Sequence, residues 1–68
     1  MSEVSTWTVV GMTCGHCVAS VTEEISEIPG VESVEGALQT GAVTVTSAAP
    51  LPAEVVRAAV VEAGYTLA

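Results

Sequence analysis

The spacing of the apolar residues changes from a strand period to a helix period, and this change most constrains the fold. From Ser5 to Val10 every second residue can face a core, because Trp7 and Val9 fall on one side of an extended chain. After Cys14 the spacing becomes that of an amphipathic helix. The apolar stripe of this helix consists of Val18, Val21, Ile25 and Ile28. The first part of the chain is therefore predicted to be a strand followed by a helix.

Two strands joined by a hairpin are predicted to follow this helix, which Pro29 and Gly30 end. The segment from Val31 to Ala37 alternates imperfectly between apolar and polar residues. The segment from Ala42 to Thr46 alternates cleanly between valine and threonine and is the better strand. Between them, Leu38 to Gly41 has the composition of a hairpin connection.

A second helix and a last short strand complete the pattern. Ser47 to Leu51 is a loop, Pro52 suits the first helical position, and Gly64 closes the helix. The apolar stripe of this helix consists of Val56, Ala59, Val60 and Ala63. Tyr65 to Leu67 is the final strand. The order β-α-β-β-α-β predicts an α+β, ferredoxin-like sandwich, with two helices on one face of a four-stranded antiparallel sheet.

The charge of the chain excludes several kinds of partner. It contains eight glutamates, no aspartate and no lysine, so Arg57 is the only strong base and the net charge is −7. A surface that binds nucleic acid needs clustered Lys and Arg, and attraction to an anionic membrane needs them too. We therefore expect neither partner.

The length of the chain and its amino terminus indicate how many domains it forms and where in the cell it is found. Sixty-eight residues allow one domain, residues 1–68, and the initial Met with the completed pattern favours a free-standing protein. The uncharged stretches are interrupted by polar residues, so no membrane insertion is expected, and Glu3 stands where a signal peptide would carry a base. We expect a cytoplasmic protein, in which a close thiol pair is more often catalytic or metal-binding than a structural disulfide.

The stretch GMTCGHC holds both cysteines and the only histidine. Cys14 is expected in the loop after the first strand and Cys17 in the first turn of the helix, where the helix amino terminus stabilises a thiolate. Two thiolates suit Cu(I), whereas a closed zinc site needs four ligands, and the same two-thiolate geometry would also accept Ag(I) or Hg(II). His16 adjoins Cys17, and adjacent side chains rarely point at one ion together. Thr13 is a candidate helix cap.

Four segments resemble the heavy-metal-associated domain family, which includes bacterial copper chaperones and the amino-terminal domains of copper-transporting ATPases. These are GMTCGHC, IPGVESVE, GAVTV and VEAGYTL. The resemblance implies that Cys14 and Cys17 bind Cu(I) and pass it to a copper-transporting P-type ATPase whose metal-binding domain carries a similar pair. It also implies that Tyr65 lies near the metal. Zinc-selective relatives often carry Asp where this chain has Thr13, which again favours a monovalent ion.

Several roles at the site stay open at this point. His16 is either a third ligand, in a dimer bridged by copper, or a solvated loop residue, and Tyr65 either supports the metal ligands or belongs to the core. Met12, Thr13 and Gly15 are expected to support the loop, with Met12 packed beneath it. The role is expected to be binding and transfer, without catalysis.

The sequence is compatible with functions besides copper transfer. The tetrad CGHC also occurs in protein disulfide isomerases, so a thiol-disulfide oxidoreductase is the main rival; there, however, Trp normally precedes the first cysteine, and here Thr13 does. Thioredoxin-like domains also run to about one hundred residues, more than this chain has. A metal-binding domain of a larger transporter, or a binder of mercury or another soft metal, would carry the same pair of thiols.

Overall fold

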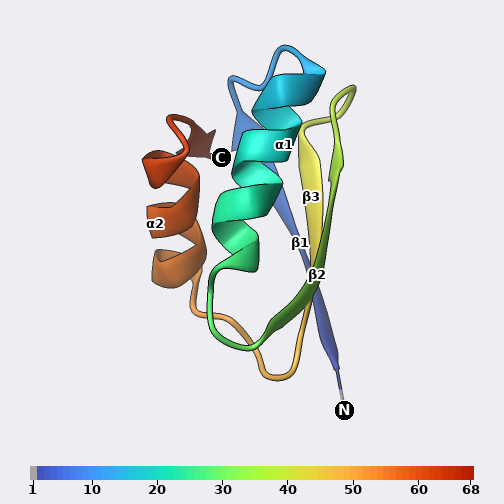
Figure 1. Ribbon diagram of the computed structural model, residues 1–68, viewed down its shortest axis with the longest axis vertical. Helices are drawn as coiled ribbons and strands as arrows, with labels where there is room; N and C mark the ends of the chain where they lie inside the picture. The colour runs from blue at the N-terminus through green and yellow to red at the C-terminus, as the bar shows by residue number, and fades with distance from the viewer. Residues whose placement is uncertain (1) are drawn as a thin grey trace.

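The computed structural model describes residues 2–68 and confirms the predicted element order, as Figure 1 shows. The six elements are β1 (Glu3–Val10), α1 (Gly15–Ser26), β2 (Val31–Ala37), β3 (Ala42–Ser47), α2 (Ala53–Glu62) and β4 (Thr66–Leu67). The strands form one sheet in the order β2-β3-β1-β4, and all neighbouring strands are antiparallel. This is the ferredoxin-like arrangement predicted from the spacing of apolar residues.

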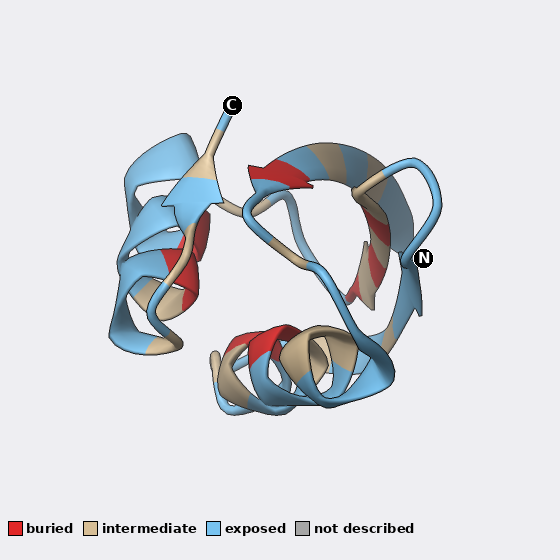
Figure 2. Ribbon diagram, turned by 90° about the horizontal axis from the view of Figure 1, so that it is seen from above, coloured by how far each residue is buried: buried red, intermediate tan, exposed pale blue. Residues whose placement is uncertain are grey.

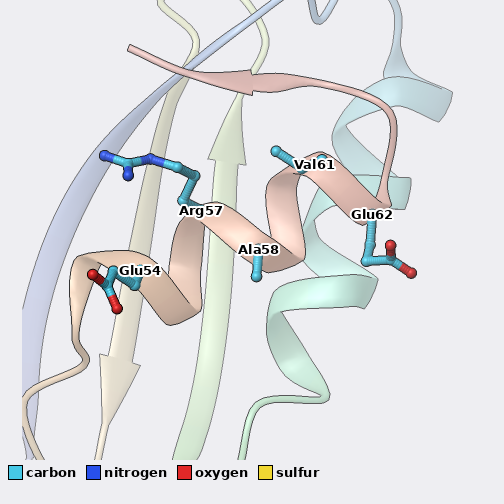
Figure 3. A pocket seen from close by; sticks show the side chains of 5 residues that line it. All are labelled: Glu54, Arg57, Ala58, Val61 and Glu62. Atoms are coloured by element: carbon cyan, nitrogen blue, oxygen red, sulfur yellow. The ribbon is translucent and has the colours of Figure 1, made fainter.

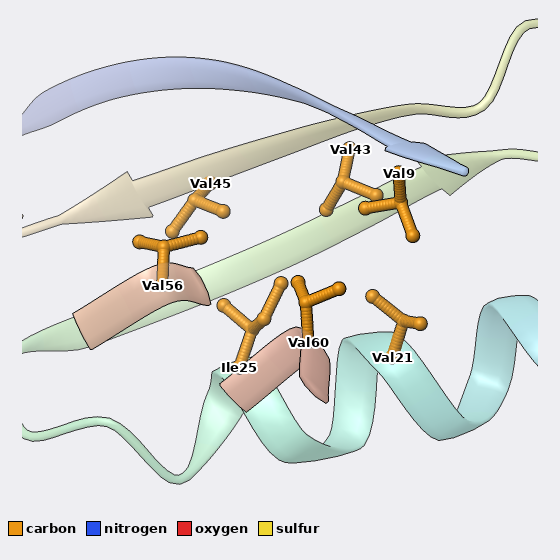
Figure 4. Close-up of a cluster of buried hydrophobic side chains, with 7 residues drawn as sticks. All are labelled: Val9, Val21, Ile25, Val43, Val45, Val56 and Val60. Carbon is orange, nitrogen blue, oxygen red and sulfur yellow. The ribbon is translucent and has the colours of Figure 1, made fainter. Parts of the chain in front are cut away.

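Both helices cover the same face of the sheet, as the view from above shows (Figure 2). The buried residues lie where helices and strands face one another. The core consists of Val9, Val21, Ile25, Val43, Val45, Val56 and Val60 (Figure 4). Six valines and one isoleucine make a small core, so its stability depends on the close packing of a few aliphatic side chains.

The imperfect alternation of β2 has a structural cause. The pairing of β2 with β3 shifts register between Val31 and Ser33. The irregularity lets Val31 and Val34 both turn partly inward, whereas an even strand would place them on opposite faces. Both side chains pack against the core cluster. The deviation from a period of two therefore marks a bulge rather than a weak strand.

Some predicted boundaries were wrong by one or two residues. Pro52 is the N-cap of α2 and has extended backbone angles, so the helix begins at Ala53. Tyr65 lies before β4, which begins at Thr66, while β1 already begins at Glu3. These differences follow from backbone hydrogen bonds at the element ends, which residue type predicts poorly.

Three loops meet at one end of the molecule. The β1–α1 loop, the β2–β3 hairpin and the α2–β4 turn all lie at the upper end in Figure 1. The hairpin is tied to β1 by a hydrogen bond of 2.8 Å from the Val9 N–H to the Gly41 carbonyl oxygen. Both predicted metal ligands lie at this end. Among the described helices, none is long and apolar enough to cross a membrane.

A shallow depression of about 490 Å³ lies on the outer face of α2 (Figure 3). It is lined by Glu54, Arg57, Ala58, Val61 and Glu62. All five residues belong to α2, so this depression is separate from the loop that carries the cysteines.

Candidate metal centre

The loop between β1 and α1 begins with a left-handed residue. Gly11 has φ +101°, a conformation that residues with a side chain rarely adopt. A Cβ at this position would lie 3.4 Å from Cδ1 of Tyr65, so the tyrosine ring packs directly against the Gly11 backbone. The next residue, Met12, is half-buried and packs against the core. The loop is therefore held from below by Met12 and from the side by Tyr65.

The two thiols lie together at the start of α1. The sulfur atoms of Cys14 and Cys17 are 3.2 Å apart, and both cysteines are free. Cys14 is the N-cap residue, with extended backbone angles, and its carbonyl oxygen accepts a hydrogen bond of 3.0 Å from the Cys17 N–H. Cys14 is exposed and Cys17 is partly buried. A metal bound by both sulfurs would therefore lie at the surface of the protein.

The surroundings of Cys17 favour its thiolate. The pKa of the Cys17 thiol falls from 9.0 to about 6, mainly because the Tyr65 hydroxyl donates a hydrogen bond to the sulfur. The backbone N–H of Thr13 and the thiol of Cys14 lower the pKa further, while burial acts weakly in the opposite direction. The amino terminus of α1 supplies partial positive charge, which also favours the thiolate. Near pH 7, Cys17 is therefore mostly ionised before any metal binds.

The same contact raises the pKa of Tyr65 above 10.0, because the phenol loses its hydrogen bond to Cys17 when it ionises. The negative charges of Cys17 and Cys14 add to this effect. The turn that holds Tyr65 is fixed by a hydrogen bond of 3.0 Å from its N–H to the Val60 carbonyl oxygen. Tyr65 therefore stays protonated and remains a donor across the neutral pH range.

The remaining residues predicted at the site take up different positions. Thr13 precedes the N-cap rather than capping the helix, and its Oγ1 lies 3.9 Å from the sulfur of Cys17. Gly15 is the first residue of α1, and a Cβ there would meet nothing within 4 Å. His16 is exposed in the first turn of α1. Its part in metal binding stays a prediction.

Across residues 2–68, no group of three or more His, Cys, Asp and Glu side chains could hold one metal ion together. The candidate centre therefore has two sulfur ligands. Cu(I) accepts two thiolates, whereas a structural zinc site uses four ligands. The donor set fits a soft metal ion.

A pair of adjacent thiols, one exposed and one partly buried, at the helix start of a ferredoxin-like sandwich is typical of a small metal-binding domain. The heavy-metal-associated domain model matches residues 6–66, and the chain belongs to this family. The family resemblance predicted from the four sequence segments is thus confirmed.

Three relatives show the range of the family. The chain is 39% identical over 59 residues to a COP-associated protein of Helicobacter felis, covering 87% of this chain and 89% of that protein. It superposes on a CopZ metallochaperone with a TM-score of 0.89 and 28% identity, over 97% of this chain and 100% of the CopZ chain. It also superposes on a copper binding domain from HMA7, a P-type ATPase, with a TM-score of 0.87 and 26% identity. That superposition covers 100% of this chain and 92% of the HMA7 domain.

Proposed function

We propose that this protein is a cytoplasmic copper metallochaperone, which binds Cu(I) through Cys14 and Cys17 and delivers it to a copper-transporting P-type ATPase. The observation that carries the proposal is the pair of sulfur atoms 3.2 Å apart, with the pKa of Cys17 lowered to about 6. Two facing sulfurs, one already ionised, are prepared for a soft cation. The similarity to the copper binding domain from HMA7 supports copper as the cargo, and the similarity to the CopZ metallochaperone supports a role in metal delivery.

Transfer would proceed by exchange of one sulfur ligand at a time. A thiolate of the partner attacks the exposed ion and forms a third copper–sulfur bond. One bond to Cys14 or Cys17 then breaks, and a second exchange completes the transfer without any change in oxidation state. The exposure of Cys14 supports this route, because an incoming thiolate needs access to the ion.

The distribution of charge suggests how a partner would approach. From Val4 to Thr22 the sequence contains no acidic residue and no Lys or Arg. Beyond it on α1 lie Glu23, Glu24 and Glu27. Glu23, the first of these glutamates, follows His16 by seven positions, which is about 10 Å along a helix. The acidic side chains therefore begin at some distance from the two thiols. A partner with a similar neutral site and basic flanks would dock without repulsion and be steered by the glutamates.

Anaerobic competition for Cu(I) against a chromogenic chelator tests the proposal, with Zn(II) measured in parallel. Cys14→Ser and Cys17→Ser are each expected to weaken Cu(I) binding by at least about 100-fold, since one thiolate cannot hold the ion as two do. The matched control is Thr13→Val, which keeps the backbone of the loop and both sulfurs. Cu(I) binding that survives the loss of both thiols would contradict the proposal.

The same measurements address the rival functions. Binding of Hg(II) or Ag(I) in preference to Cu(I) would assign the site to another soft metal. Turnover of a model disulfide substrate would favour a thiol-disulfide oxidoreductase instead. The mass of the copper-loaded protein separates a monomer from a copper-bridged homodimer, in which His16 is a candidate third ligand.

A further inference from the structure

The first turn of α1 rests on β2 at a glycine. Gly36 pairs with Val43, whose side chain is fully buried in the core, so position 36 faces the helices. A Cβ at Gly36 would lie 2.6 Å from Cγ1 of Val18 and 3.5 Å from Cγ2 of Thr22. The methyl group of Val18 thus occupies the space that a side chain at position 36 would fill.

Val18 is covalently next to Cys17, and both are hydrogen-bonded to Cys14. The N–H groups of Cys17 and Val18 donate to the Cys14 carbonyl oxygen, at 3.0 and 3.3 Å. A helical turn moves largely as a unit, because its hydrogen bonds fix the backbone angles. The depth at which Val18 sits above Gly36 therefore also sets the depth of both cysteines.

We propose that Gly36 is a positioning residue for the metal site, because its missing side chain lets the first turn of α1 sit low enough on β2. At this depth Cys17 meets Tyr65 from the α2–β4 turn. The expected effect of Gly36 on Cu(I) binding rests on the function proposed above, whereas its expected effect on the position of the two thiols does not.

An added methyl group at position 36 cannot be absorbed locally. A carbon–carbon distance of 2.6 Å is about 1 Å short of the optimal separation. Valine in a helix has one strongly preferred χ1 rotamer, so Val18 cannot turn its Cγ1 away without strain. The first turn of α1 must move outward instead, and the cysteines move with it.

Gly36→Ala, Val18→Ala and the double variant test this inference in the full chain. Gly36→Ala is expected to weaken Cu(I) binding about tenfold in the chelator competition, the size of effect typical of residues that orient metal ligands. Val18→Ala removes the methyl group that the new Cβ would meet. The double variant is therefore expected to bind Cu(I) within about twofold of Val18→Ala.

A second measurement needs no copper. The equilibrium between the two thiols and the Cys14–Cys17 disulfide, set in glutathione redox buffers, depends on the contacts that stabilise the reduced form, among them the contact of Cys17 with Tyr65. Gly36→Ala is expected to shift this equilibrium severalfold, and the double variant is expected to restore it. If the unmodified protein does not bind Cu(I), but the thiol–disulfide equilibrium shifts in Gly36→Ala and is restored in the double variant, the proposed function is wrong and the positioning role of Gly36 is still supported.

Ile25→Val is the matched control for general loss of stability. Ile25 is fully buried in α1, two turns beyond Val18, and contributes to the core rather than to the loop. Ile25→Val is expected to leave both Cu(I) binding and the thiol–disulfide equilibrium unchanged. The inference is overturned if Gly36→Ala behaves like the unmodified protein, if Ile25→Val reproduces its effects, or if the double variant is not rescued.

Discussion

The hydroxyl group of Tyr65 lowers the pKa of the Cys17 thiol, although Tyr65 follows α2 and Cys17 lies in the first turn of α1. This contact is the largest cause of the lowered pKa of Cys17. It depends on Gly11, against whose backbone the tyrosine ring packs. The acidity of one thiol is thus set by two segments that are distant in sequence, the stretch from Gly11 to Cys17 and the α2–β4 turn.

Replacing Tyr65 with Phe is expected to raise the pKa of Cys17 from about 6 towards its ordinary value of 9.0. The ring that packs on Gly11 is kept, and only the hydrogen bond to the thiolate is lost. The absorbance of the thiolate at about 240 nm, followed against pH in the reduced, metal-free protein, measures the change.

Thr13→Val is the control for this experiment, because Thr13 lowers the pKa of Cys17 through its backbone. Loss of its hydroxyl group, 3.9 Å from the sulfur, is expected to change the titration little. An unchanged midpoint in Tyr65→Phe would show that the tyrosine does not control the thiol.

The lowered pKa of Cys17 also predicts how stability depends on pH. The folded protein holds this thiol as a thiolate from about pH 6, whereas the unfolded chain ionises it near 9.0. The folded state therefore binds fewer protons between these values, and its stability rises with pH across this window. The contribution is complete above pH 9 and is lost as the pH falls through 6.

Urea unfolding of the reduced protein at several pH values between 6 and 9 measures this effect. The midpoint is expected to rise more steeply with pH than in Cys17→Ser, which keeps every other titrating group. The raised pKa of Tyr65 acts only above 10.0, outside this range. Parallel curves for the two proteins would argue against linkage through Cys17.

The order of elements was predictable because the apolar spacing repeats over whole segments. In α1, Val21 and Ile25 belong to the predicted stripe, and both are fully buried. The start of α1 was predicted less well: Thr13 was a candidate cap, but the N-cap is Cys14, with no side-chain hydrogen bond. Where no side chain caps a helix, composition carries little information about its first residue.

Long-range contacts at the candidate site were harder to predict than the position of its two cysteines. The position of Cys14 and Cys17 follows from their neighbours in sequence. The contact of Val18 with Gly36 depends on the register of β2, which contains a bulge. A glycine inside a strand is a signal of close approach, but it does not say which residue approaches.

Two valines with different burial test the account of the core. Val43 is fully buried, and truncation to Ala is expected to lower the free energy of unfolding by about 2 kcal/mol. Val61 is 57% exposed on α2, so Val61→Ala is expected to change stability by less than about 0.5 kcal/mol. Urea denaturation of both variants gives the comparison, and equal losses would be inconsistent with the packing described.

Replacing Gly41 or Gly30 with Ala distinguishes the energetic cost of backbone conformation from the cost of a steric clash. Both residues have positive φ, +74° and +94°, so an Ala at either position costs about 1 kcal/mol in conformational energy. A Cβ at Gly30 would meet nothing within 4 Å, whereas one at Gly41 would lie 2.7 Å from the Val9 carbonyl oxygen. That oxygen belongs to a central strand and cannot move aside without disturbing the sheet.

Gly41→Ala is therefore expected to destabilise the protein by about 1 to 3 kcal/mol more than Gly30→Ala, the usual cost of overpacking. The clash also disrupts the hydrogen bond from the Val9 N–H to the Gly41 carbonyl oxygen, which joins the β2–β3 hairpin to β1 beside the β1–α1 loop. Urea unfolding measures the difference in stability, and amide exchange of Val9 reports on the lost hydrogen bond. Equal destabilisation by the two variants, with Val9 still protected, would show that the hairpin adjusts to the added methyl group.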